Sequence, residues 1–515
     1  MTIITVYDGG DTIGGNKILV EEGEEGVFLD FGLNFSKYSE YFSEFLTDRR
    51  GRGIHDLIHL DLIPKLDVYR PDLTPSDLHT FAFYRPSLKA VLLSHIHLDH
   101  SGNLGLLRMD LPVVASPESV ALLKAMRDLG PTTLGCETAY TSRRRYADSE
   151  GLTLHSDHAS PFVCRDFFCT EDPPSTLIDF ASTIPRGGEG RKPLEPGTLG
   201  RLEALELPFE VKAAAVDHSV CGACGYILLG ESPVAYTGDL RAHGKNSHKT
   251  WEFAKEARHA GTLIIEGTCA GRGKEGCTTE EEVQENCLAA VEEEEGLVIA
   301  DFSGNNFERL ETFLWIAEKT GRELVLTKKD AYMLRALTCS GHIAWCEKEK
   351  RLSVYKDLKG APAKRWEEVT LDDWKGKTVG FRELRADPGG HILCFSFYDL
   401  KNLLDIRPEG GIYIYSSCEA HSEEEAIDFI RLSRWLRLFD LKIHGFRIEV
   451  SGGKEFPVFE QGYHASGHAT EGDLERIIDI IDPDLLIPVH TECPEWFIGK
   501  ARKVALPAKG ERIVL

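Results

Sequence analysis

Short apolar runs that end in polar residues form the clearest pattern in this chain. The run 90–93 ends at Ser94 and is followed by a segment rich in histidine. Three later strand-like runs show the same order of apolar stretch and polar residue: 210–216 before His218, 234–236 before Asp239, and 262–265 before Glu266. Runs of this length between turns are typical of buried strands. We therefore predict that several strands end at one edge of a sheet and bring these polar side chains together.

The two ends of the chain show a related pattern. The strands expected near the start, joined by glycine turns, are 3–7, 17–21 and 26–30. The third of them ends at Asp30. Near the other end, a helix is predicted over 471–481 and a strand over 484–489, and this strand ends at His490. The last part of the chain thus returns to the arrangement of the first.

From residue 275 the pattern changes to alternating helices and strands. The predicted elements are a helix over 279–293, a strand over 296–300, a helix over 308–320 and a strand over 321–326. Such alternation is typical of an α/β domain with a mostly parallel sheet. We therefore expect an inserted domain at 275–457, between a first part at 1–274 and a C-terminal part at 458–515.

A polar turn is predicted at 301–306, between a strand and the start of a helix. Ser303 and Asn305 lie in this turn. Backbone amides and small polar side chains at such a place commonly hold a phosphate. An ordinary helix cap accounts for the same residues equally well. Both interpretations stay open. The same choice between a phosphate site and an ordinary turn applies to Ser416 and Ser417, which follow a later strand.

Two segments lack a clear strand pattern. Residues 34–88 contain short amphipathic helical pieces and are expected to lie over the site. Residues 130–205 are the least patterned, and the density of Pro and Gly from 173 to 200 predicts a loop or lid. Isolated histidines such as His79 are expected to be structural or surface residues.

Composition narrows the class of protein. Of 515 residues, 42% are hydrophobic and 28% are charged, as in ordinary globular proteins. No apolar run is long enough to span a membrane and the start lacks a signal-peptide pattern, so we expect a cytoplasmic protein without a membrane partner. The 13 cysteines follow no disulfide spacing and are expected to be reduced. The net charge of -24 argues against non-specific coating of nucleic acid, but leaves a narrow basic channel open.

The segment after the run 90–93 carries the strongest chemical signal. Its metal-capable side chains lie within six residues: His95, His97, Asp99 and His100. Imidazole and carboxylate together suit zinc, manganese or iron. Because side chains of so tight a turn point in different directions, two ions close together can use them better than one. Strand ends elsewhere supply the remaining candidate ligands: His218, Asp239 and His490.

Together these motifs resemble the metallo-β-lactamase superfamily and, within it, the β-CASP nucleases, in particular their ribonuclease J branch. The residues that match the family's metal motifs are His95, His97, Asp99, His100, His218, Asp239 and His490. Asp30 matches the family's earlier strand-end aspartate and Glu266 its β-CASP acidic residue. The His-x-Ser-Gly-His segment is matched by His464, Ser466 and His468. The resemblance spans most of the chain and implies a metallo-β-lactamase αββα sandwich with an inserted α/β β-CASP domain.

The resemblance also implies a two-metal hydrolase. One divalent ion would be held by His95, His97, His218 and Asp239, and the second by Asp99, His100, Asp239 and His490. Zn²⁺ is expected, with Mn²⁺ as the alternative, and a hydroxide shared by the ions would attack a phosphodiester. The expected catalytic residues are Asp99, His468, Asp30 and Glu266. Asp99 would orient or deprotonate the water, and His468 would protonate the leaving oxygen or clamp the phosphate. A pocket for the phosphate of a terminal nucleotide would be formed by Ser303, Asn305, His464 and Ser466.

These roles predict a 5′-to-3′ exonuclease on single-stranded RNA, with endonuclease action as an addition. A DNA exonuclease or a small-ester hydrolase could use the same ions, although a covering α/β domain suits a polymer better than a small ester. A non-catalytic RNA-processing subunit is the further alternative, which the complete ligand set disfavours. A homodimer stays open, and we expect neither an N-terminal RNA-binding domain nor a C-terminal assembly domain. Residues 418–421 depart from the turn expected of ribonuclease J.

Overall fold

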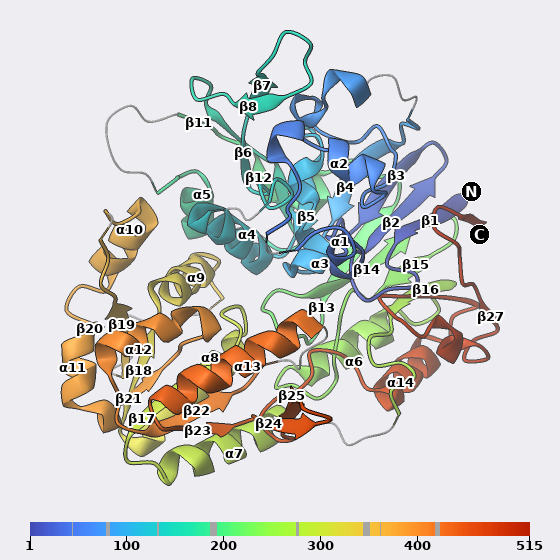
Figure 1. The fold of residues 1–515 in the computed structure, drawn as a ribbon. Helices are drawn as coiled ribbons and strands as arrows, with labels where there is room; N and C mark the ends of the chain where they lie inside the picture. The colour runs from blue at the N-terminus through green and yellow to red at the C-terminus, as the bar shows by residue number, and fades with distance from the viewer. Residues whose placement is uncertain are drawn as a thin grey trace.

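The computed structural model describes most of the chain. The described residues are 1–43, 45–78, 83–130, 133–185, 193–273, 278–342, 351–360, 362–417 and 423–515. His79 and the departing turn at 418–421 lie outside them. Figure 1 shows the strands of the first part in the upper right of the molecule, and the helices and strands of the inserted segment in the lower left.

Two facing sheets form the centre of the first part. The first sheet has the order β12 (Leu199–Arg201), β10 (Phe167–Cys169), β5 (Val113–Ala115), β4 (Ser87–Leu92), β3 (Glu25–Leu29), β2 (Lys17–Glu22), β1 (Thr2–Asp8) and β28 (Arg512–Val514). The second sheet has the order β13 (Glu210–Ala215), β14 (Cys224–Leu229), β15 (Val234–Tyr236), β16 (Thr262–Glu266), β26 (Leu485–Val489) and β27 (Lys503–Val504). The strands predicted from the apolar runs are therefore present, most of them within one or two residues of the expected bounds.

Alternation along the strands explains the layering. In β4, Leu92 points into the core between the sheets, whereas Val91 packs on the opposite face with helix α4 (Pro117–Leu129). In β16, Ile264 joins the same central core, and its neighbours pack against the helices of the other outer face, α6 (Ser247–Glu256) and α14 (Glu471–Ile481). Helix, sheet, sheet and helix thus follow one another, which confirms the predicted αββα sandwich.

The chain closes on itself around the insertion. Strand β28 pairs antiparallel with β1, so the two ends of the chain lie side by side (Figure 1). Strand β16, which precedes the insertion, pairs in parallel with β26, which follows it. The last part of the chain therefore completes the second sheet and carries His490 to its edge.

The inserted segment forms a third sheet. Its order is β20 (Thr378–Gly380), β19 (Leu352–Lys356), β18 (Glu323–Leu326), β21 (His391–Leu393), β17 (Leu297–Asp301), β22 (Gly411–Tyr415) and β23 (Leu441–His444). Every pairing between these strands is parallel. The helices of the segment are α7 (Glu280–Glu292), α8 (Phe307–Thr320), α9 (Lys328–Cys339), α10 (Arg365–Asp373), α11 (Phe381–Ala386), α12 (Leu403–Ile406) and α13 (Glu423–Leu438). The expected α/β character is present, while the domain boundaries near 274 and 458 stay a prediction.

Smaller elements complete the fold. The short sheets pair β9 (Phe162–Cys164) with β6 (Tyr140–Ser142) and β11 (Leu194–Glu195), β7 (Arg144–Tyr146) with β8 (Leu154–Ser156), and β24 (Phe446–Ser451) with β25 (Lys454–Phe459). The remaining helices are α1 (Phe35–Ser39), α2 (His55–His59), α3 (Leu98–Ser101) and α5 (Ser175–Ala181). Helix α5 lies where the density of Pro and Gly predicts a loop, because Leu177 and Phe180 pack into the core. None of the described helices is both long and apolar enough to cross a bilayer.

Candidate metal centre

The histidine-rich segment begins where strand β4 ends. The backbone N–H and the hydroxyl of Ser94 both donate to Asp30, each at 2.7 Å, which ties the segment to the end of β3. A side chain at Gly32 would collide with the backbone oxygen of Asp99. Glycine at this position thus allows the two chain segments to cross at close range. The crossing holds the carboxylate of Asp99 and the imidazoles on either side of it at the sheet edge.

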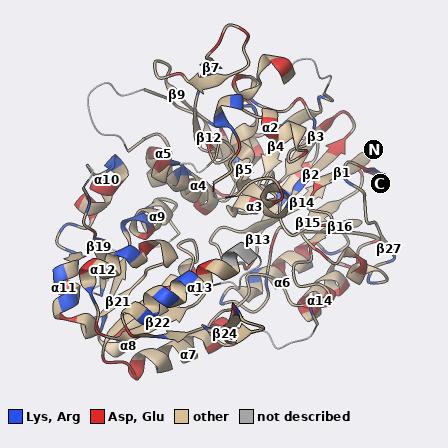
Figure 2. Ribbon diagram, in the orientation of Figure 1, with Lys and Arg blue, Asp and Glu red and all other residues tan. Residues whose placement is uncertain are grey.

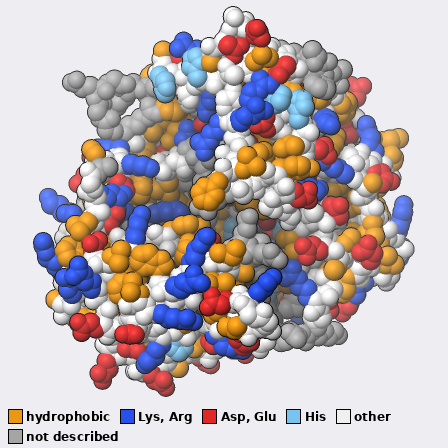
Figure 3. Space-filling view, in the orientation of Figure 1, with side chains coloured by type: hydrophobic (Ala, Val, Ile, Leu, Met, Phe, Trp, Pro, Cys, Tyr) orange, Lys and Arg blue, Asp and Glu red, His pale blue; other side chains and the backbone are white. Residues whose placement is uncertain are grey.

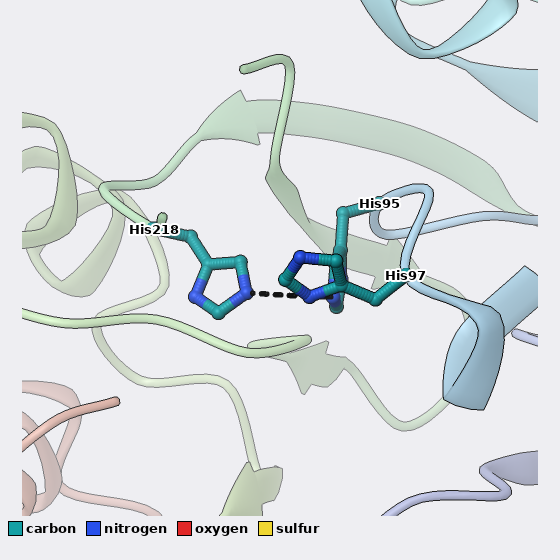
Figure 4. Close-up of side chains that lie close together, drawn as sticks. All are labelled: His95, His97 and His218. Atoms are coloured by element: carbon teal, nitrogen blue, oxygen red, sulfur yellow. Dashed lines mark hydrogen bonds between the residues drawn. The ribbon is translucent and has the colours of Figure 1, made fainter. Parts of the chain in front are cut away.

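A first group of imidazoles meets at this edge. Nδ1 of His97 lies 3.1 Å from Nε2 of His95 and 3.2 Å from Nε2 of His218 (Figure 4). Burial lowers the pKa of both His95 and His218, so both rings are neutral at physiological pH. Neutral rings that point nitrogens at one another cannot all be satisfied by each other's protons. The arrangement fits a cation held between the three nitrogens.

A second group adds carboxylates. Nε2 of His100 lies 3.1 Å from Oδ2 of Asp239, and Nε2 of His490 lies 3.1 Å from Oδ2 of Asp99 and 3.5 Å from Oδ2 of Asp239. Asp239 also approaches the first group, with Oδ2 at 3.8 Å from Nε2 of His95. Its other oxygen is buried without a hydrogen-bond partner in the described part of the chain. Asp239 is therefore placed to serve both groups, as a shared metal ligand would be.

Buried partners fix the rings of the second group. Nδ1 of His100 donates to Oδ2 of Asp30 at 2.7 Å, and the hydroxyl of Tyr236 donates to the same oxygen at 2.5 Å. Nδ1 of His490 lies 2.9 Å from the hydroxyl of Thr268. Such partners orient a metal-binding imidazole and select its free nitrogen. Asp30 therefore orients a candidate metal ligand and is not itself in the ligand set.

His218 is oriented in the same way by Gly467. Nδ1 of His218 donates to the Gly467 carbonyl at 2.6 Å, which leaves Nε2 facing His97. The sequence pattern did not point to Ser94, Tyr236, Thr268 or Gly467 as supporting residues. Single hydroxyls and carbonyls carry no spacing signal, so only the fold reveals them.

Two residues at the centre adopt an uncommon backbone conformation. Asp30 has a φ of 57° and His490 a φ of 53°. Non-glycine residues in the left-handed region are strained and tend to occur at functional sites. At His490 the conformation is stabilised by its backbone N–H, which donates to the carbonyl of Gly9 at 2.6 Å.

Glu266 and His468 form a third group together with His490 among the described residues. Glu266 is fully buried and accepts the backbone N–H groups of Thr268 at 2.8 Å and Ala469 at 3.3 Å. Nδ1 of His468 lies 3.4 Å from Glu266 and 3.8 Å from Asp239. Burial opposes a charge on His468, but the carboxylates of Glu266, Asp239 and Asp99 together outweigh it and raise the pKa of His468 to about 9. Glu266 thus holds the segment that presents a protonated His468.

Comparison with known proteins agrees with this centre. Residues 85–263 match the family model described as the metallo-beta-lactamase superfamily. This part of the chain is therefore similar to that superfamily. The matched range contains most of the candidate ligands, and the resemblance expected from the motifs is confirmed.

Two curated relatives and one solved structure extend the comparison. Ribonuclease J of Sinorhizobium meliloti is 22% identical over 430 residues, and Ribonuclease J of Thermus thermophilus is 22% identical over 357 residues. These matches cover 82% and 66% of this chain, and 61% and 56% of the relatives, so the chain spans about six-tenths of their length. A crystal structure of a protein of unknown function from Enterococcus faecalis V583 matches the whole of both chains, with a TM-score of 0.68 and 22% identity. This likeness shows a shared fold.

A buried ion network joins the metallo-β-lactamase domain to the inserted segment. Its members are Asp217, Arg241, Glu280, Glu308 and Arg309. Arg241 contacts Glu280 at 2.9 Å and Asp217 at 3.4 Å, and it also pairs with Glu308. Arg309 contacts the other oxygen of Glu280 at 2.8 Å. Because Asp217 adjoins His218 and Arg241 follows Asp239 closely, the network ties the loops of two candidate ligands to helices α7 and α8.

The residues expected to bind phosphate lie in two places. Ser303 is exposed in the turn before α8, and its hydroxyl accepts the backbone N–H of Asn305 at 3.4 Å. Asn306, not Asn305, caps the helix by accepting the backbone N–H of Arg309. His464 and Ser466 lie between β25 and α14, where the Ser466 hydroxyl accepts the backbone N–H of His468 at 3.1 Å. Asn305 is thus not used as the helix cap and stays a candidate for phosphate binding.

Proposed function

We propose that this protein is a metal-dependent hydrolase that cleaves phosphodiester bonds in RNA. The observation that carries the proposal is the meeting of imidazoles and carboxylates from distant segments around Asp239. A metallo-β-lactamase domain and two relatives named Ribonuclease J support the reaction class and the substrate. The same support makes an enzyme the preferred reading over a binding subunit.

The candidate ligands divide into two sets that share Asp239. His95, His97, His218 and Asp239 would hold one ion, and Asp99, His100, Asp239 and His490 the other. These nitrogen and oxygen donors suit Zn²⁺, with Mn²⁺ as the alternative. When bound, the ions would supply water activation and neutralise charge on the phosphate.

The chain's own side chains support proton transfer at this centre. Asp99 is partly exposed, so it can reach a water molecule at the candidate metal centre and accept its proton. His468 carries a raised pKa and stays protonated at neutral pH, which suits donation to a leaving oxygen or a contact with the scissile phosphate. Asp30 and Glu266 support these groups from behind, as positioning residues.

Surface charge is compatible with a nucleic-acid substrate despite the net charge of -24. Figure 2 shows Lys and Arg on α11 and α13 of the inserted segment, and Asp and Glu on α14. On the face seen in Figure 3, Lys and Arg side chains gather over the inserted segment beside exposed hydrophobic side chains. We therefore propose that single-stranded RNA approaches along this segment, with Ser303, Asn305, His464 and Ser466 holding its terminal phosphate.

The test is a digestion time course with the metal-loaded full chain. The RNA substrates are single-stranded, carry the label in their 5′-terminal nucleoside, and end in either a 5′ monophosphate or a 5′ hydroxyl. A DNA strand of the same sequence is tested beside them. We expect the labelled mononucleotide as the first product, and faster release from the monophosphorylated RNA. Intact RNA in the presence of a full metal complement would overturn the proposal. Equal cleavage of the DNA strand would broaden the substrate to both nucleic acids.

A further inference from the structure

A cavity of about 590 Å³ lies in the inserted segment. Its walls come from the carboxyl ends of neighbouring parallel strands β19, β18, β21, β17 and β22 and from residues that follow them. At about 4.8 Å per strand, such a row spans roughly 19 Å. Open α/β sheets bind their ligands at this edge, and a cavity of this volume accommodates a nucleotide.

The cavity contains hydrogen-bond donors that the described residues leave unused. Tyr355 is 3% exposed, and its hydroxyl has no hydrogen-bond partner within the described part of the chain. Trp366, on α10, leaves its indole N–H without an acceptor among the same residues. An unpaired buried donor costs free energy, and an indole N–H can only donate. The two groups therefore need acceptors from a ligand.

Carboxylates line the same cavity. Asp301 ends β17, Asp330 lies in the first turn of α9, and Asp399 follows β21. No Lys or Arg among the described residues forms an ion pair with any of them. Burial and the nearby charge of Asp399 raise the pKa of Asp301 to about 7 and that of Asp330 to about 6. These carboxylates would gain from a ligand that donates hydrogen bonds.

Three of the described lysines line the cavity: the charge of Lys329 lowers the pKa of Asp330 only in part, and the other two pair with further carboxylates. Lys328 pairs with Asp357 and lies 3.8 Å from Glu367. Lys359 pairs with Glu367 as well and lies 3.9 Å from Asp357. Two lysines and two carboxylates thus balance one another. Asp301, Asp330 and Asp399 accept from the hydroxyls of Tyr413, Thr327 and Ser396, respectively, but form no ion pair among the described residues.

An exposed aromatic ring stands at the mouth of the cavity. Tyr398 lines the cavity yet is 81% exposed, and its ring makes a T-shaped contact with Phe397 at a centroid distance of 5.6 Å. Aromatic rings of this kind offer stacking platforms for the bases of single-stranded nucleic acids. The mouth also includes Ser303, from the turn expected to hold phosphate.

We propose that this cavity binds a guanine base. Guanine presents the adjacent N1–H and N2–H donors, which match the two oxygens of the Asp330 carboxylate, and the acceptors O6 and N7, which match an indole N–H and a phenol O–H. Its flat face fits against Tyr398. Uracil lacks the paired donors, and an aliphatic polyamine lacks acceptors for Trp366, so both leave groups of the cavity unsatisfied.

The base has two sources with the same chemistry. If it belongs to the RNA strand, the inference rests on the proposed function, and a phosphate held at Ser303 would place its own base in the cavity. If it is a free guanine nucleotide, the cavity is an effector site of the same protein. Binding without cleavage and digestion of RNA therefore form separate arms of the test.

The binding arm uses calorimetric titration of the full chain with GMP, AMP, CMP and UMP. We expect GMP to bind at least tenfold more tightly than UMP. Tyr398→Ala should weaken every nucleotide, roughly tenfold, because it removes the stacking surface. Asp330→Asn should abolish the preference for GMP, because an amide cannot accept both donors. The matched control is Tyr146→Ala, which removes another exposed tyrosine, on β7, and should change nothing.

Equal binding of GMP and UMP, or an unchanged preference in Asp330→Asn, would overturn the inference. Because this arm needs no catalysis, it decides the matter even if RNA proves not to be a substrate.

The digestion arm distinguishes the two sources. If the base belongs to the strand, RNA with a 5′ guanine should show a KM about tenfold lower than RNA with a 5′ uracil, GMP should compete with it, and Tyr398→Ala should remove the difference. If the base is a free nucleotide, GMP should change kcat on guanine-free RNA without competing.

Discussion

The metal centre and the cavity of the inserted segment both lie at the carboxyl ends of strands, but their polar groups are satisfied differently. At the candidate metal centre, His100, His218 and His490 each commit one ring nitrogen to a protein partner, at 2.6 to 2.9 Å. In the cavity, Tyr355 and Trp366 have no such partner among the described residues. The protein itself thus orients the imidazoles of the candidate metal centre. The donors of the cavity, in contrast, would find their partners in a ligand.

The largest effect is expected at the residue shared by both metal groups. Asp239→Ala should lower the metal content at both positions and reduce kcat/KM on RNA by roughly 10⁴-fold, because the metals supply several kcal/mol of charge stabilisation. Metal analysis and steady-state kinetics check this. Asp172→Ala is the control, since its carboxylate is in an exposed pair with Arg201. If the Asp239→Ala variant keeps its metal content and its rate, Asp239 is not a ligand shared by both groups.

His468 tests whether the metal centre also contains a group that is not a ligand. His468→Ala should reduce kcat by roughly 10³-fold with the metal content unchanged, as expected for the loss of a proton donor. The measurement pairs metal analysis with single-turnover rates. If metal is lost together with the rate, His468 belongs to the ligands, as its place beside Glu266 and His490 would also allow.

The buried ion network tests whether ion pairs hold the inserted segment to the first part of the chain. Arg241→Met should lower the free energy of unfolding by about 3–5 kcal/mol, because it leaves Asp217 buried without its arginine and Glu280 with Arg309 alone. Arg201→Met, in the exposed pair with Asp172, should cost less than about 1 kcal/mol. Denaturant titrations of both variants provide the comparison. Equal losses would mean that the buried network adds nothing to the contact between the regions.

The smallest effect is expected in the cavity and depends on pH. The folded pKa of Asp301 is raised to about 7, above its ordinary value of 3.8, so the folded state binds the proton more tightly and stability falls as pH rises from about 4 to about 7. Asp301→Asn removes this penalty. It should stabilise the protein by about 2 kcal/mol more at pH 8 than at pH 5, seen as a difference in Tm. Equal shifts of Tm at both pH values would show that burial of Asp301 is not costly.

The sequence predicted the metal centre far better than the cavity. Three histidines and an aspartate within six residues form a dense signal, and His218, Asp239 and His490 each follow a strand. The fold brings all of them together, although their role as ligands stays a proposal. The turn expected at 301–306 begins one residue later in the structure, because Asp301 is the last residue of β17.

The cavity could not be predicted because its residues share no local pattern. Asp330 lies in an α-helix, Tyr355 in a strand and Tyr398 in a short 3-10 helix. They meet only because β21 inserts between β17 and β18 in the sheet, and strand order is not encoded in local periodicity. For the same reason, the partners Ser94 and Thr268 of the metal centre became visible only in the fold.

The pairing of β16 with β26 has a consequence for the order in which the protein is made. His95, His97 and His218 all precede the insertion, whereas His490 follows it. While a ribosome is still translating the inserted segment, the nascent chain has its first group of imidazoles but lacks the strand that carries the last ligand. The proposed second set of metal ligands is therefore complete only after translation has passed residue 490. On the proposed function, the nascent chain cannot cleave RNA until its synthesis is nearly finished.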